Sequence, residues 1–455
     1  MLSYGVSPDM VVRKEFFGGM IKKLDNAPQD FIGYVNDVGY FILDICSQTP
    51  ATVEKIHDVL DAHGIETEIK DIEDFCTVFE KKGYLLKEKN DYSHSYSLDT
   101  EFPQKKVLSS PVELDLYPTM LCNQRCSFCY LPREMLSQKE HMEEHTLKNI
   151  FNQCTSAKVI AINILGGEPF MYPEIVEKAI ELHNEKILLN ITTNGTAIPH
   201  RLHETLTGKT IYILFSIHSS IPQIHDKKAG MEGAFIKAMH SARKLIKKGA
   251  HVGIQMVITS ENSPKDIFRL FRMSKNMGAH GFFINFPYCG KWMDYEYYSS
   301  LIPGKWFYNI TKALEVLRET HESMNILYKG GLGFALQNEI PTISSPLEAL
   351  NTGCEGGVTG LEVMPNGDVY PCCLSLGIQK FRLGNINETM LHKLWNSPLL
   401  HGFRNREKMV PPESRCRECS FFALCKGGCF MSSLYAFGRI QGDPACPVIR
   451  GIENE

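Results

Sequence analysis

Short apolar runs alternate with amphipathic stretches between residues 111 and 290. Six runs predict strands, at 112–119, 159–167, 187–195, 211–219, 251–259 and 281–289. Apolar residues recur every three or four positions between them, which predicts helices at 143–154, 173–185, 200–206, 235–249 and 264–278. Strands that alternate with helices form a parallel sheet. The pattern therefore predicts an α/β fold, a partial (β/α)6 barrel of the TIM type, because the two further units of a full barrel are not found in the sequence.

The first 105 residues follow a different pattern. Apolar runs at 10–24 and 30–37, broken by Gly-Gly and Asn-Asp, predict strands and turns. Amphipathic stretches at 38–48, 52–64 and 72–86 predict helices, of which Thr52 can cap the second. A small meander followed by three helices predicts a winged-helix-like α+β domain. The polar stretch 91–106 is read as its linker to the barrel.

The C-terminal part changes character again. After a mostly helical stretch to about residue 345, the chain is rich in cysteine and glycine and has little periodicity. We expect a small core there that is held together by metal. The predicted domains are 1–105, 106–320 and 321–455.

Composition limits the classes of protein and partner. The 455 residues carry a net charge of −4, which gives no general case for binding nucleic acid. No apolar run is long enough for a membrane span and the N-terminus lacks the pattern of a signal peptide, so we expect a cytoplasmic protein without membrane contact. Fifteen cysteines are many for a reducing compartment. Eleven fall in two groups, at 122–129 and 354–446, which indicates metal binding.

Three cysteines stand together in "CNQRCSFCY", directly after the first predicted strand. Three thiolates with a vacant position suit an iron–sulfur cube with one open iron, or zinc with a fourth ligand from elsewhere. Cys122, Cys126 and Cys129, with the aromatic Phe128 before the last, resemble the Cys-x3-Cys-x2-Cys motif of radical S-adenosylmethionine (SAM) enzymes. The resemblance implies a 4Fe–4S cluster on these cysteines whose open iron binds SAM.

Segments at later strand ends resemble the same family. "GGEP" follows the second predicted strand, where the family holds the methionine ammonium, and Glu168 can accept a charge-assisted hydrogen bond there. "TTNG" and "FSIHSS" resemble segments that reach the ribose and the carboxylate. "IHDKKAG" resembles His-Asp-x-x-Arg-Gly, but Ala229 replaces the usual Arg and Lys228 is a candidate substitute. The resemblance implies SAM contacts from Phe128, Gly166, Gly167, Glu168, Pro169, Thr193, Asn194, Ser216 and Asn262.

The C-terminal cysteines resemble the SPASM module, an auxiliary iron–sulfur domain of peptide-modifying radical enzymes. The resemblance implies that Cys354, Cys372 and Cys429 bind a first auxiliary cluster, and that Cys416, Cys419, Cys425 and Cys446 bind a second. With the SAM-binding cluster this makes three 4Fe–4S clusters. The fourth ligand of the first auxiliary cluster is not assigned, because Cys373 adjoins a ligand and Cys289 is remote in sequence. A zinc ribbon is the alternative.

The N-terminal segment resembles the PqqD-like recognition element of ribosomal peptide maturation. The edge of its meander can pair with an extended leader peptide. The likeness implies a maturase of a ribosomally made precursor peptide that forms a thioether or carbon–carbon crosslink and takes electrons from a flavodoxin or ferredoxin. No catalytic base is assigned. One alternative is oxidation or epimerisation of a side chain, as in sulfatase maturases, although Cys373 stands where these carry an acidic base. Another is an iron–sulfur redox sensor with a DNA-binding N-terminal domain.

Overall fold

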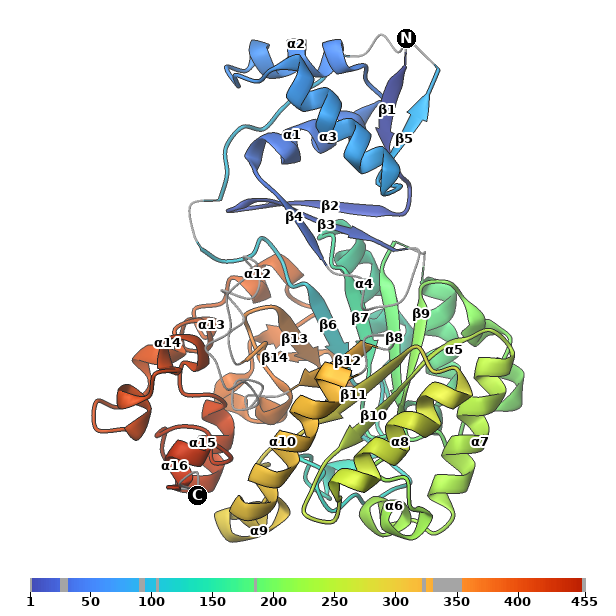
Figure 1. The fold of residues 1–455 in the computed structure, drawn as a ribbon, viewed down its shortest axis with the longest axis vertical. Coiled ribbons are helices and arrows are strands. Elements are labelled where there is room, and N and C mark those ends of the chain that lie inside the picture. Colours follow the sequence, from blue (N-terminus) through green and yellow to red (C-terminus); the bar gives the residue numbers. More distant parts are fainter. Residues whose placement is uncertain are drawn as a thin grey trace. The chain divides into compact units, whose positions relative to one another are not determined.

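A computed structural model describes residues 2–24, 32–89, 95–103, 106–183, 186–320, 325–329 and 354–451. The chain forms two compact units (Figure 1). The first comprises Met1–Ser110 with Glu185–Ile187, and the second comprises Pro111–Asn184 with Leu188–Glu455. Each unit is described by itself.

The first unit contains the predicted meander and its three helices. The meander strands β2 (Met10–Glu15), β3 (Gly18–Lys23) and β4 (Gly33–Val35) pair antiparallel in chain order. The helices are α1 (Asp37–Gln48), α2 (Val53–Ala62) and α3 (Ile69–Lys81). Thr52 caps α2 as predicted, because its hydroxyl accepts a hydrogen bond from the Lys55 N–H at 3.2 Å. The winged-helix likeness stays a prediction.

The sequence pattern missed two strands of this unit. β1 (Ser3–Val6) and β5 (Leu85–Glu88) pair antiparallel in a separate two-stranded sheet. β5 begins two residues after Gly83, so its leucines belong to a strand and not to the end of the preceding helix. The core of the unit lies between these sheets and the helices, and includes the fully buried Leu43, Ile56 and Leu60.

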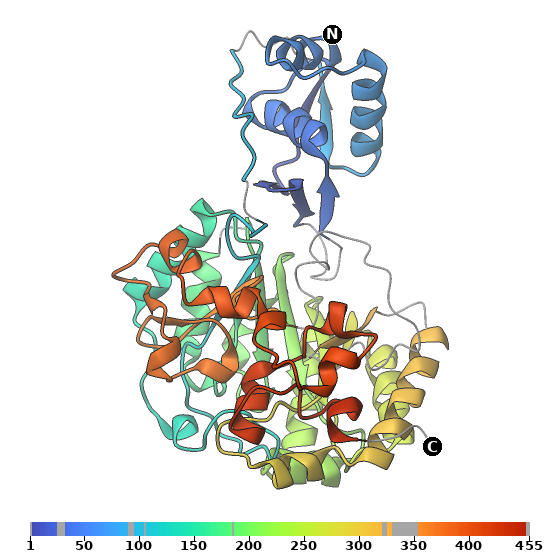
Figure 2. The same ribbon diagram turned by 90° about the vertical axis from the view of Figure 1, so that its left-hand side faces the viewer.

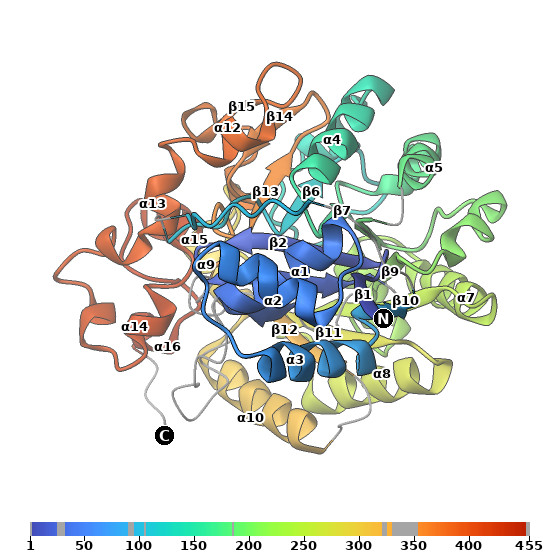
Figure 3. The same cartoon turned by 90° about the horizontal axis from the view of Figure 1, so that it is seen from above.

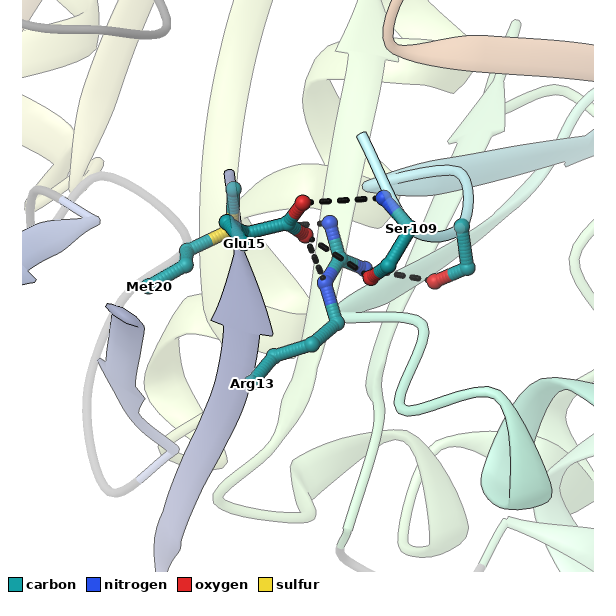
Figure 4. Close-up of polar contacts among 5 residues, drawn as sticks. Arg13, Glu15, Met20 and Ser109 are labelled. Carbon is teal, nitrogen blue, oxygen red and sulfur yellow. Dashed lines mark hydrogen bonds and ion pairs between the residues drawn. The ribbon is translucent and has the colours of Figure 1, made fainter. Parts of the chain in front are cut away.

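Arg13 and Glu15 form a buried ion pair on β2 (Figure 4). Hydrogen bonds connect this pair to Ser109 and Ser110, which follow the linker. On β2, Arg13 Nε donates to Glu15 Oε1 at 2.6 Å. The Glu15 carboxylate also accepts from the Ser109 N–H at 2.8 Å, and Arg13 Nη1 donates to the Ser110 hydroxyl at 2.9 Å. Burial raises the pKa of Glu15 in spite of the neighbouring guanidinium. Charge-assisted hydrogen bonds therefore hold Ser109 and Ser110 in place, and the next strand of the chain begins at Glu113.

A single sheet organises the second unit. Its described strands follow the order β12-β11-β10-β9-β8-β7-β6-β13-β14-β15, and every pair from β12 to β13 is parallel. The bounds are β6 (Glu113–Leu116), β7 (Ala161–Ile164), β8 (Leu188–Thr193), β9 (Ile211–Ser216), β10 (His251–Val257), β11 (Gly281–Asn285), β12 (Asn325–Lys329), β13 (Gly360–Val363), β14 (Asp368–Tyr370) and β15 (Gly384–Asn385). The six predicted strands are β6 to β11, in the predicted parallel arrangement. β12 and β13 extend this set on either side.

Helices cover one face of the parallel strands and form an arc outside them (Figure 3). They are α4 (Glu144–Ser156), α5 (Pro173–Leu182), α7 (Ala234–Lys247), α8 (Pro264–Met277) and α10 (Gly304–Thr320). Leu114, Ile162 and Ile191, which alternate with polar strand residues, are completely buried. The predicted helix at 200–206 is wrong: two short 3-10 turns, His200–Leu202 and Thr205–Thr207, stand there. The segment between Pro199 and Gly208 is too short for a stable helix.

Two more short helices belong to the barrel part, and the C-terminal region contains several others (Figure 2). Beside the sequence-predicted elements lie α6 (Pro222–Ala229) and α9 (Tyr295–Leu301). The C-terminal helices are α12 (Leu391–Trp395), α13 (Leu400–Arg404), α14 (Phe422–Cys425), α15 (Phe430–Phe437) and α16 (Pro447–Arg450). Across the described residues, every helix is too short or too polar to traverse a bilayer.

Candidate active site

The first cysteine group lies on the loop that follows β6, and neighbouring backbone holds this loop in place. The Cys122 N–H donates to the Leu136 carbonyl at 3.1 Å. The N–H groups of Arg125 and Ser127 each donate at 3.0 Å to carbonyls at the end of α6, those of Ala229 and Lys228. The loop is thus fixed between its own return and the end of α6.

The three thiols are close enough for one to affect the pKa of another. Burial raises the pKa of Cys122 to about 12, and burial together with Cys129 and Cys122 raises that of Cys126 well above its ordinary value. Within the described part of the chain, no group of three or more His, Cys, Asp or Glu side chains is arranged so that it could bind a single metal ion. In a 4Fe–4S cube each cysteine takes a different iron, so its thiolates need not converge on a point. Three neighbouring free thiols on one loop fit such a cluster.

The "GGEP" turn after β7 packs against this loop. Gly166 has a φ of +123°, and a side chain on Gly167 would place its Cβ 2.2 Å from the Met120 carbonyl oxygen. The N–H of Gly167 donates to the Thr119 carbonyl at 3.0 Å, and that of Glu168 donates to the Leu121 carbonyl at 2.8 Å. The two glycines therefore allow the backbone of the cysteine loop to lie against the turn.

Glu168 connects the end of β7 to the end of β8. Its carboxylate accepts from the Thr193 hydroxyl and the Asn194 N–H, each at 2.7 Å, and from the Phe170 N–H at 3.2 Å. The side chain is almost completely buried, and this burial raises its pKa to about 7. The carboxylate we expected to face the cofactor is thus largely occupied by protein donors. We infer that it positions the neighbouring backbone.

Other predicted cofactor residues form hydrogen bonds with residues that the sequence did not single out. Asn194 Nδ2 donates to Asn123 Oδ1 at 2.8 Å, which joins the end of β8 to the cysteine loop. Asn123, between the first two cysteines, was not singled out from the sequence, although its place inside the motif is the available signal. The Ser216 hydroxyl accepts from Gln255 Nε2 at 2.8 Å, across β9 and β10.

Asn262 is occupied on all sides. Its Nδ2 donates to the His218 carbonyl at 2.8 Å and to Asp266 Oδ2 at 2.7 Å, while its Oδ1 accepts from Lys228 Nζ at 2.5 Å and from the Thr259 N–H at 3.0 Å. An amide side chain has two donor hydrogens and two lone pairs, so none is left for a ligand. The predicted contact of Asn262 with SAM stays a prediction. Asn262 instead connects the loops after β9 and β10.

The cysteines of the first auxiliary group lie near one another, and their role as cluster ligands stays a prediction. A Cβ on Gly356 would lie 2.7 Å from Cys372 Cβ and 3.6 Å from Cys354 Sγ. Burial and the nearby Cys354 raise the pKa of Cys429 to about 12. Cys373 is half-buried, and its pKa is raised by desolvation and by the carboxylate of Glu362.

The second auxiliary group gathers at the end of the chain. Burial raises the pKa of Cys416, and the neighbouring Cys419 adds to this effect. Burial raises the pKa of Cys425 in the same way, with a contribution from Cys446. Asp443 lies between the two auxiliary groups: it accepts from the Cys429 N–H at 3.0 Å and from the Ala445 N–H at 2.9 Å. No sequence pattern pointed to this carboxylate.

Comparison with known families agrees with these arrangements. Residues 116–273 match the Radical SAM superfamily. Residues 354–420 match the iron–sulfur cluster-binding domain SPASM. The chain therefore contains a radical SAM domain followed by a SPASM domain. Its radical SAM domain implies a 4Fe–4S cluster and SAM, and its SPASM domain implies additional iron–sulfur clusters.

This radical SAM enzyme has distant relatives of known activity. It is 22% identical to the PqqA peptide cyclase of Ruegeria pomeroyi, over 76% of this chain and 88% of that protein. It is 25% identical to the subtilosin biosynthesis protein AlbA of Bacillus subtilis, over 73% and 69% respectively. Streptococcus suis SuiB bound to precursor peptide SuiA has the same fold, with a TM-score of 0.73 at 21% identity over 98% of this chain and 100% of SuiB.

Proposed function

We propose that this enzyme is a maturase of a ribosomally made precursor peptide. The observation that carries the proposal is an N-terminal α+β unit with an antiparallel meander placed ahead of the radical SAM and SPASM domains in one chain. The relatives named PqqA peptide cyclase and AlbA, and the SuiB fold seen with a precursor peptide, support it.

The first unit would bind the leader part of the precursor. In the described order β2-β3-β4, the strands β2 and β4 are the outer ones, and an extended peptide would add as a further strand beside one of them. Binding the leader there raises the effective concentration of the core peptide at the radical site to the order of millimolar. The active site then does not need to bind the core peptide tightly.

The second unit would carry out the reaction. When bound, a 4Fe–4S cluster and SAM supply a 5′-deoxyadenosyl radical that abstracts a hydrogen atom from the substrate. Cys122, Cys126 and Cys129 would hold the cluster, and the loops fixed by Glu168 and Asn194 would shape the cofactor site. Forming a thioether or carbon–carbon crosslink removes a second hydrogen as a proton and an electron.

The auxiliary cysteines would hold two more 4Fe–4S clusters that accept this electron. Iron–sulfur potentials span about −700 to +450 mV with environment, so one chain can contain both donors and acceptors. A flavodoxin or ferredoxin would deliver the electron that starts each turnover. The proposal thus includes three 4Fe–4S clusters, a flavodoxin or ferredoxin as electron donor, and a cytoplasmic location.

Incubation with a candidate precursor tests the function. Reconstituted, dithionite-reduced enzyme is mixed with SAM and peptides encoded by short reading frames beside its gene. We expect 5′-deoxyadenosine, and a peptide that has lost two hydrogen atoms per crosslink and keeps the crosslink on fragmentation. A peptide of unchanged mass that has exchanged one hydrogen with solvent would favour epimerisation instead. 5′-Deoxyadenosine without any change in any peptide would contradict the proposed substrate class.

A further inference from the structure

A row of polar side chains crosses four neighbouring strands of the second unit. The register aligns Glu362 on β13 with Asp115 on β6. It also aligns Asp115 with Asn163 on β7, and Asn163 with Asn190 on β8. These four residues, the polar row, alternate along their strands with apolar residues that are almost completely buried. The row therefore lies on one face of the sheet, opposite the apolar face.

The amides of the polar row direct their donors toward carboxyl groups. Asn163 Nδ2 donates to Asp115 Oδ1 at 2.5 Å and to Glu113 Oε2 at 2.9 Å. Asn190 Nδ2 in turn donates to Asn163 Oδ1 at 2.7 Å. Because both nitrogens are used in this direction, the Oδ1 of Asn190 is left at the far end. It is enclosed and has no hydrogen-bond partner within the described structure.

Glu362 provides a second unpartnered acceptor at the other end of the row. Only 8% of the residue is exposed, and its Oε2 has no hydrogen-bond partner among the described residues. The carboxyl group interacts with the Tyr117 hydroxyl and the Cys373 N–H, while burial and the neighbouring Asp115 and Glu113 raise its pKa. Three carboxyl groups thus stand close together beside an acceptor without a donor. Buried acceptors in native proteins are almost always paired, so the row has room for a donor-rich group.

The chemistry of the row favours an organic cation over a metal ion. Within the described residues, no three carboxylate, His or Cys side chains are placed so that they could bind one metal ion. An ammonium or guanidinium group carries several N–H donors and can reach acceptors that lie apart. Its charge would also offset the repulsion among the carboxyl groups. Asp115 and Glu113 are only half-buried, which leaves them accessible to a ligand.

The position of the row connects this cation with the substrate. Glu362, Asp115 and Asn163 each stand one residue before the end of their strand. The loops that follow β6 and β7 carry the first cysteine group and the "GGEP" turn, and barrels of this type act on their substrates at this end of the strands. A group bound to the row therefore lies beside the place where a hydrogen atom would be abstracted.

We propose that Glu362, Asp115 and Glu113 bind the ammonium or guanidinium group of a basic side chain in the peptide substrate, and so select which core residue reaches the radical. The inference rests on the proposed function, because it names the class of residue that the core peptide must contain. Asn163 holds the two carboxylates of β6 in place for this contact.

Two substitutions remove negative charge from the row while keeping side-chain shape. Glu362→Gln changes the enclosed end, and Glu113→Gln changes the half-buried end, so the second variant decides if the first does not fold. Glu181→Gln is the matched control, because this carboxylate lies exposed on α5. Each variant is made in the full chain and reconstituted anaerobically, and iron content and circular dichroism are recorded first.

The deciding measurement is the binding of two small probes by isothermal titration calorimetry, with and without SAM. The probes are N-acetyl-arginine amide and its neutral isostere N-acetyl-citrulline amide. We expect the wild type and Glu181→Gln to bind the arginine probe at least tenfold more tightly than the citrulline probe. In Glu362→Gln and Glu113→Gln this preference should fall below threefold. Saturating SAM should leave the binding of the arginine probe in place.

Three results would overturn the inference: equal binding of both probes by the wild type, an unchanged preference in the folded variants of the row, or displacement of the arginine probe by SAM. The last would assign the row to the cofactor. A precursor that is crosslinked with the same KM after every Lys and Arg of its core is replaced by Gln would also overturn it, while the proposed function would stand. Binding of the arginine probe that depends on Glu362, without modification of any peptide, would support cation binding and contradict the proposed function.

Discussion

Replacing Glu168 by Ala should release the end of β8 from the "GGEP" turn. The carboxylate accepts two backbone N–H groups, those of Asn194 and Phe170, as well as the Thr193 hydroxyl. The hydroxyl can turn to another acceptor, but the buried N–H groups cannot. Each orphaned donor costs about 1–3 kcal/mol, so the gross loss is about 2–6 kcal/mol.

The desolvation of the carboxylate offsets part of this loss. Burial raises its pKa from 4.5 to about 7, which corresponds to about 3 kcal/mol against the charged form. The net local destabilisation is therefore at most about 3 kcal/mol, and the Asn194 amide should exchange with deuterium faster, by up to roughly 150-fold. Glu181→Gln is the control, because this exposed carboxylate on α5 pairs with Lys178 on the same helix. Equal exchange at Asn194 in Glu168→Ala and the control would refute the role we assign to the carboxylate.

The same carboxyl group predicts a pH dependence. Because its pKa is raised, the folded chain holds a proton that the unfolded chain has released between pH 4.5 and about 7. The stability from this proton is fully present below pH 4.5 and is lost as the pH rises through about 7. Thermal unfolding should show a smaller loss over this window in Glu168→Gln than in wild type. Identical pH profiles would show that Glu168 does not titrate in the folded chain as described.

Three further substitutions test other parts of the account. Cys126→Ala should abolish SAM cleavage while the auxiliary clusters keep their iron; turnover at the wild-type rate would exclude this cysteine as a ligand. Gly167→Ala should strip the SAM-binding cluster, since its Cβ would lie 2.2 Å from a backbone oxygen, whereas Gly249→Ala, whose Cβ meets nothing within 4 Å, should cost only about 1–2 kcal/mol for its left-handed backbone. Equal iron content in the two variants would contradict that packing. Glu15→Ala should destabilise the first unit by about 3–5 kcal/mol and Arg13→Met/Glu15→Ala by less, because the single change removes the carboxylate beside a buried guanidinium. Hydrogen exchange within residues 2–24 measures both, and an equal or larger effect in the double variant would count against the pair.

The parts of this site that depend on residues close together in the chain could be predicted from the sequence. The cysteine motif, the "GGEP" turn and the six apolar runs are each local, and each was placed correctly along the chain. The strand β13 was missed because "GLEV" is short and pairs with β6, almost 250 residues earlier, only after the chain has folded. A local pattern does not contain such a pairing.

The direction of side chains was also beyond the sequence. Glu168 and Asn262 were correctly placed at strand ends, but the sequence could not show that protein donors and acceptors would occupy them. Satisfying buried polar groups depends on neighbours that come from several loops. The same holds for Asp443, which lies between two cysteine groups that are separated along the chain.

The central claim is that Cys122, Cys126 and Cys129 hold an iron–sulfur cluster with one iron open to SAM. Electron paramagnetic resonance of the dithionite-reduced enzyme, recorded with and without SAM, tests it most directly. We predict that SAM changes the spectrum of the wild type and leaves that of Cys126→Ala unaltered. A wild-type spectrum that is indifferent to SAM, or zinc in place of iron in anaerobically purified enzyme, would contradict the account.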